Sequence, residues 1–97
     1  MKIYEHLELL GKKAKCRVTG YEGVVTSICF DLYGCIQALI QPGINSDGKI
    51  GEPMWFDVLR IKILDEKPIM KQPNFETGAI ADGKNGPAEK TRGWIIK

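Results

Sequence analysis

The sequence predicts a mainly β protein: a small, five-stranded, SH3-like, partly open barrel with a short N-terminal segment and an extended C-terminal tail. Short segments of alternating hydrophobic residues fill positions 18–64, and glycines stand at nearly every corner between them. After residue 65, prolines and glycines replace this alternation. We therefore expect an SH3-like β-barrel domain at residues 1–65 and a partly docked or flexible tail at residues 66–97.

The N-terminal segment, Lys2–Leu10, has apolar residues at positions 3, 7 and 10, a spacing that fits one or two helical turns. An irregular lead-in fits the same residues. In both cases Gly11 ends the segment, because glycine adopts the left-handed backbone of a helix end at the lowest cost. We expect Leu7, Leu9 or Leu10 to cover an open end of the barrel.

The first two strands are expected on either side of a glycine-rich corner. Lys15–Thr19 is the first strand, Gly20-Tyr21-Glu22-Gly23 is the corner, and Val24–Leu32 is the second strand. Alternation along the second strand places four residues on the core face: Val24, Thr26, Ile28 and Phe30.

The third strand, Cys35–Gln41, returns after a turn at Tyr33-Gly34. Pairing Phe30 with Gly34 keeps one apolar face intact, and it turns Ile36, Ala38 and Ile40 toward the core. The same register places Cys29 opposite Cys35, where we expect two thiols and no disulfide.

The remaining elements follow a long polar loop, Pro42–Pro53, which has a turn at Asn45–Gly48. Met54–Asp57 is the expected fourth strand, and Ile61–Leu64 is the fifth. Val58–Arg60 between them fits a single tight 3₁₀ turn. The short carboxylate of Asp57 is expected to accept hydrogen bonds from the amides of that turn.

Charge and cysteine content limit the classes of function. The 14 basic and 12 acidic residues give a net charge of +2, too balanced for a strong nucleic-acid footprint. Three cysteines without metal-ligand spacing argue against a secreted disulfide framework. The N-terminus lacks the apolar core of a signal peptide, and no apolar run reaches the roughly 20 residues of a membrane span. We expect a cytoplasmic protein with no membrane association.

Three motifs carry a resemblance to a known family. They are Val18-Thr19-Gly20-Tyr21-Glu22-Gly23, then Tyr33-Gly34-Cys35 followed by Gln41-Pro42, and finally Trp55-Phe56-Asp57. This order resembles a family of small uncharacterised proteins of phages, prophages and other mobile genetic elements, over roughly residues 8–65. Cys16-Arg17 departs from it, because the family often carries an acidic residue there. The glycine corner also resembles KOW- and Tudor-type SH3-like barrels, which bind RNA, peptides or methylated side chains, or assemble with other proteins.

Candidate binding residues are aromatic and basic. Aromatic side chains on a barrel rim stack bases or enclose cations, and basic side chains contact phosphates. A structural role is the alternative: Phe30 and one of Trp55 or Phe56 fill the core, and the lysines keep a strand edge soluble. The lone histidine, His6, is expected at the surface. The candidate binding residues are Tyr21, Tyr33, Trp55, Lys13, Lys15, Arg17 and Arg60.

The sequence lacks the common enzymatic motifs, including phosphate loops, zinc-protease motifs and nucleophile elbows. No cofactor, metal or catalytic residue is expected. The leading hypothesis is a non-enzymatic binding or assembly module of a mobile element, acting through protein–protein contacts with a partner or with itself as a homo-oligomer. The alternative is a protein that binds nucleic acid or a nucleotide. Candidate surfaces are the polar loop Ile44–Gly51, the turn tyrosines and the apolar Trp94-Ile95-Ile96 end.

Overall fold

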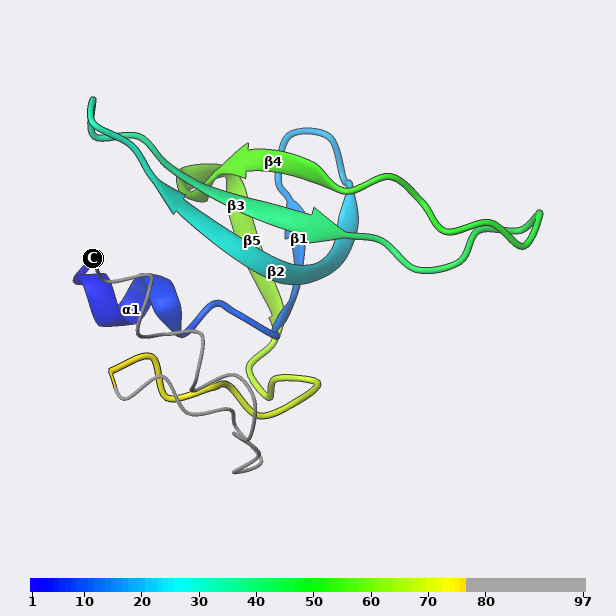
Figure 1. The fold of residues 1–97 in the computed structure, drawn as a ribbon. Helices are drawn as coiled ribbons and strands as arrows, with labels where there is room; N and C mark the ends of the chain where they lie inside the picture. The colour runs from blue at the N-terminus through cyan, green and yellow to red at the C-terminus, as the bar shows by residue number, and fades with distance from the viewer. Residues whose placement is uncertain (77–97) are drawn as a thin grey trace, which may run out of the picture.

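The computed structural model describes residues 1–76, which form a five-stranded antiparallel sheet preceded by one short helix (Figure 1). The mainly β class and the five strands are confirmed. The elements are α1 at Ile3–Leu7, β1 at Lys13–Cys16, β2 at Glu22–Phe30, β3 at Ile36–Gln41, β4 at Met54–Asp57, a 3₁₀ turn η1 at Val58–Arg60, and β5 at Ile61–Asp65.

The strand order in the sheet is β4-β3-β2-β1-β5. The first four strands pair with their neighbours in the chain, and β5 returns to pair with β1. η1 carries the chain from one edge of the sheet to the other, and the Asp57 carboxylate accepts a 2.8 Å hydrogen bond from the amide of Leu59 as predicted. Within residues 1–76 no pairing joins β4 to β5, so closure into a barrel stays a prediction.

The register of the β2–β3 hairpin differs from the predicted one. Phe30 pairs with Ile36 rather than Gly34, and the pairing shifts between Val25 and Ser27. The shift is a β-bulge, since Thr26 is an extra residue on β2 with no counterpart on β3. A bulge reverses the alternation, so Val25 is fully buried in place of Val24, and Thr26 is exposed.

The core lies at the middle of the sheet. It consists of Leu9, Ala14, Cys16, Val25, Ala38, Ile40, Phe56 and Ile61. Leu9 covers it from the segment after α1, as predicted, and Phe56 rather than Trp55 fills it. The predicted burial of Phe30 is wrong: the hairpin runs past the end of β1, and Phe30 is 44% exposed, with its ring in a T-shaped contact with the His6 ring. The predicted surface position of His6 is also wrong, because its ring is buried there.

Cys29 and Cys35 are not opposite each other. In the observed register Cys29 faces Gln37, and Cys35 closes the turn, where its amide and that of Tyr33 each donate a 2.9 Å hydrogen bond to the Asp31 carboxylate. All three cysteines are free; Cys16 is buried, and the other two are exposed.

Candidate functional site

A segment after β5 returns along the sheet and forms one wall of an apolar surface hollow. We call this segment, residues 66–76, the strap. The amide of Ile69 donates a 2.8 Å hydrogen bond to the carbonyl of Gly11. Gly11 has a φ of 87°, but the helix ends earlier than predicted, at Leu7, and turns carry the chain from there to Gly11. The Gln72 side chain donates to the carbonyls of Leu7 and Leu10, at 3.1 and 2.8 Å. The Leu7 carbonyl also accepts a 3.1 Å hydrogen bond from the amide of Leu10, so Gln72 adds a second donor there and ties the strap to the residues that follow the helix.

Two further contacts attach the strap to the rest of the described chain. Lys12 forms a 2.8 Å ion pair with Glu66 at its start. Tyr4 donates a 2.6 Å hydrogen bond to Glu76 at its end, and this bond raises the pKa of the tyrosine. The strap is therefore attached at both ends and in the middle, and its hydrophobic side chains are held over β2.

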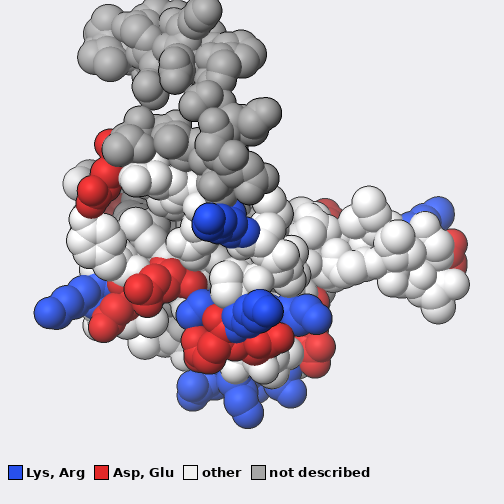
Figure 2. Space-filling view, turned by 90° about the horizontal axis from the view of Figure 1, so that it is seen from below, with Lys and Arg blue, Asp and Glu red and all other residues white. Residues whose placement is uncertain are grey.

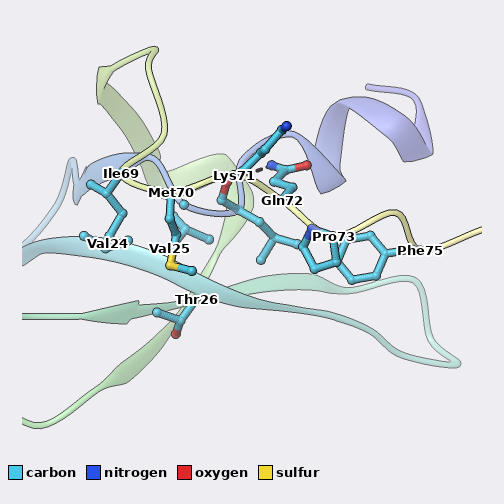
Figure 3. A pocket seen from close by; sticks show the side chains of 11 residues that line it. Val24, Val25, Thr26, Ile69, Met70, Lys71, Gln72, Pro73 and Phe75 are labelled. Atoms are coloured by element: carbon cyan, nitrogen blue, oxygen red, sulfur yellow. Dashed lines mark hydrogen bonds between the residues drawn. The ribbon is translucent and has the colours of Figure 1, made fainter. Parts of the chain in front are cut away.

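The strap and β2 enclose an apolar hollow of about 430 Å³ (Figure 3). Ile69 and Met70 lie over Val24 and Val25, while the Lys71 side chain points away from the sheet. A second hollow of about 490 Å³ adjoins it, since both are lined by Val24 and Ile69. We call the two joined hollows the trough. Its lining is predominantly apolar, and the charged side chains on the second hollow are Lys13 and Glu22.

The trough continues toward the protruding loop between β3 and β4. Gln41, Pro42 and Gly43 line both the second hollow and a further hollow at the base of this loop. Residues 42–53, which we call the arm, extend away from the sheet as a narrow two-stranded ribbon (Figure 1). Ile44 and Ile50 form a bridge across the ribbon, and each is 70% exposed.

The arm is ordered by its own hydrogen bonds. The amide of Asn45 donates to the carbonyl of Lys49 at 2.8 Å, and the Asn45 side chain accepts from the Lys49 amide at 3.0 Å. At the base, the Gln41 side chain donates to the carbonyls of Pro42 and Gly51. The predicted turn at Asn45–Gly48 is confirmed, and Gly48 supplies the φ of 85° that it needs.

The predicted basic candidates are dispersed among acidic groups. Lys15 on β1 pairs laterally with Glu22 on one side and Lys62 on the other, and Lys13 lies opposite Asp65. Figure 2 shows the same mixture, with Lys and Arg beside Asp and Glu on the face seen from below. Arg17 is exposed just after β1. These neighbours lower the local positive potential that phosphate binding uses.

Tyr21 and Arg60 are packed together against Phe56. The rings of Tyr21 and Phe56 are 5.4 Å apart, and the Arg60 guanidinium lies 5.2 Å from the centre of the Phe56 ring. The Tyr21 hydroxyl donates to the backbone carbonyl of Glu52 at the base of the arm. This cluster fixes the position of the arm relative to the sheet, so Tyr21 and Arg60 have structural contacts of their own.

Tyr33 and Trp55 lie apart from that cluster and from each other. Tyr33 is 86% exposed at the tip of the β2–β3 hairpin, and Trp55 is half exposed on the edge strand β4. The structure therefore does not bring the seven predicted binding residues together at one place. Their binding role stays a prediction.

Cys16 occupies an unusual environment under the glycine corner. Burial raises the pKa of its thiol, but hydrogen bonds from Thr19, from the backbone amide of Val18 and from Arg60 outweigh this and lower the pKa to about 7. The backbone amide of Thr19 lies 3.5 Å from the sulfur. These groups are donors, which stabilise a thiolate but supply no base for nucleophilic catalysis.

Sequence reasoning predicted a partly docked tail but missed the trough beneath it and the apolar bridge of the arm. Ile44 and Ile50 were placed in a polar loop, although each stands three residues from Asp47 in the turn, as bridge partners in a hairpin do. His6 was missed as a buried residue. Within residues 1–76 its Nδ1 atom and the Nε atom of Arg60 have no hydrogen-bond partner.

Neither a metal cluster nor a membrane helix is found in the described part of the chain. Residues 1–76 contain no group of three His, Cys, Asp or Glu side chains placed to hold a metal. No helix there is long and apolar enough to cross a membrane.

Comparisons with family models, curated proteins and solved structures find no match to this chain. The resemblance to mobile-element proteins therefore stays a prediction.

Proposed function

We propose that this protein is a non-enzymatic binding or assembly module that acts through protein–protein contacts made at the trough. One observation carries the proposal: three predominantly apolar hollows follow one another along the surface from the strap to the base of the arm, each sharing lining residues with the next. Contiguous exposed apolar surface is costly in water, and on soluble proteins it marks places where another macromolecule binds. A protein segment with apolar side chains is the partner that suits this lining.

The strand order supports an SH3-like, partly open barrel, because the fifth strand returns to the first. Such a fold leaves the edges of β4 and β5 available for assembly. The sequence motifs support a role in a phage or other mobile element, and three free cysteines fit a reducing cytoplasm. Nucleic-acid binding is less favoured, since Glu22 on β2 lies beside Lys15 on β1, and Asp65 on β5 lies beside Lys13 on β1.

Site-specific photo-cross-linking in cells that naturally contain the protein tests this function. A benzophenone amino acid replaces Ile69, which is half exposed in the trough, and a control places it at Leu32, on the tip of the β2–β3 hairpin. We expect protein adducts from position 69 and few from position 32. Adducts with nucleic acid only, or equal protein labelling at both positions, would overturn the proposal.

A further inference from the structure

The arm has an apolar surface that its own chain does not cover within residues 1–76. Ile44 and Ile50 lie side by side on it and are largely exposed, although hydrogen bonds within the ribbon hold them in fixed positions. A two-stranded ribbon standing alone in water is only marginally stable. Packing its apolar side against another surface would stabilise it, and the ordering cost is already met by the ribbon's own bonds.

The trough provides a surface of the matching kind. It is apolar, it is open, and it begins at Pro42 and Gly43, where the arm leaves the sheet. Because arm and trough adjoin on one surface, a two-fold axis near the base of the arm would bring each arm to the other copy's trough. Such an interface is the same on both subunits and closes at two copies.

Charges at the two surfaces are complementary. The arm tip carries Asp47 and Lys49, two residues apart, and the second hollow of the trough carries Lys13 and Glu22 on neighbouring strands. Each surface thus offers one anion and one cation beside its apolar residues. Opposed across an interface, the pairs favour one register over its reverse.

We propose that two copies of this chain form a symmetric dimer in which the arm of each copy lies in the trough of the other. The inference rests on the proposed function, because it names the partner of the same trough. Ile44 and Ile50 supply the apolar contact, and the charges of Lys49 and Glu22 meet across the interface. The dimer leaves the unpaired edge of β4 free.

Sedimentation velocity over a concentration series tests the dimer. The wild-type protein is expected at about twice the 10.8 kDa of one chain. Ile44→Ser with Ile50→Ser removes the apolar contact from residues that are already exposed, so the fold is retained while the dimer dissociation constant rises by about tenfold or more. Leu32→Ser, at the opposite hairpin, is the control and leaves the dissociation constant unchanged. A wild-type monomer, or a double variant with unchanged mass, overturns the inference.

A charge exchange tests the register. Lys49→Glu and Glu22→Lys each place like charges together and weaken the dimer several-fold, while the two combined restore it. Loss without restoration by the combined variant contradicts the proposed register.

The cross-linker at position 69 separates failure of this inference from failure of the proposed function. An adduct between two copies, through residues of the arm, supports both. An adduct with a different protein overturns the dimer but leaves the proposed function standing. An adduct only with residues 94–96 of the same chain overturns the dimer and also removes the support for the proposed function. Adducts with nucleic acid alone overturn both.

Discussion

The β3–β4 hairpin places one type of residue in two environments. In the sheet, Ile40 pairs with Met54 and is fully buried; a few residues further, Ile44 pairs with Ile50 in the arm and is 70% exposed. Both pairs are antiparallel. The difference is the neighbouring strand. β2 pairs with β3 as far as the Val24–Gln41 pair, and the pairing ends there. Burial of these isoleucines therefore depends on β2, the strand beside the hairpin, and not on the hairpin itself.

The largest expected effect comes from the glycine where β2 turns away. A Cβ atom at Gly23 would collide with the carbonyl oxygen of Gln41 and lie 2.8 Å from Cγ2 of Ile40. Gly23→Ala therefore forces β2 away from β3, and we expect a loss of about 4 kcal/mol or more in the free energy of unfolding. Urea denaturation followed by circular dichroism measures it.

Gly43, at the base of the arm, is the matched control. A Cβ atom there meets nothing within 4 Å among residues 1–76. Gly43→Ala should change the free energy of unfolding by less than about 0.5 kcal/mol. Equal losses in the two variants would show that sheet and arm unfold as one unit and would remove the distinction between them.

Two aspartates allow a smaller, sharper comparison. Asp57 in the sheet and Asp47 in the arm each accept a hydrogen bond from the amide two residues later, at 2.8 and 3.2 Å. Asp57→Ala should cost about 1 kcal/mol, because η1 loses its cap and the chain must still cross to β5. Asp47→Ala should cost only a few tenths, since no core residue depends on the turn at the arm tip.

Thermal unfolding of the two alanine variants measures this difference. Asp57→Asn retains an acceptor at the cap and should recover most of the lost stability. If Asp47→Ala were the more damaging change, the arm would be contributing to the stability of the sheet.

The smallest expected effect is a pH dependence confined to the sheet. The pKa of Cys16 is about 7 when folded, against 9.0 for an unperturbed thiol. A lowered pKa favours the thiolate in the folded state, so its contribution to stability grows as the pH rises from about 7 toward 9 and is lost as the pH falls through 7. Urea midpoints at pH 6, 7, 8 and 9 should show this rise for the wild-type protein. The rise should be absent in Cys16→Ala, and a parallel rise in that variant would assign it to another group.

Local patterns predicted most of the elements. The fourth strand and the 3₁₀ turn were predicted at their exact bounds, because Gly51 and Pro53 mark the start of the strand. Gly11 and Gly48 were identified as corners because positive φ angles select glycine. Each of these features depends on residues close together in the chain.

One error is local: the first strand, predicted at Lys15–Thr19, lies at Lys13–Cys16, because residues 17–19 form a turn. The other errors involve contacts between distant residues. A bulge at Thr26 has no residue signature, because any residue can be the unpaired one when the partner strand is one residue short. His6 and Phe30 exchanged their expected environments, since the helix docks where the hairpin passes the end of β1. The trough was not predicted, because its walls come from β2 and a strap more than 40 residues later.

The Gln72 side chain has a consequence beyond holding a helix end. It bonds two carbonyls at the end of the helical region, and the same strap supplies the wall of the trough. The N-terminal helix and that wall are thus expected to open and close as a single cooperative unit. Any molecule that binds the trough would slow amide hydrogen exchange in α1, residues 3–7, which do not line the trough, so occupancy can be measured at a distance from the binding surface.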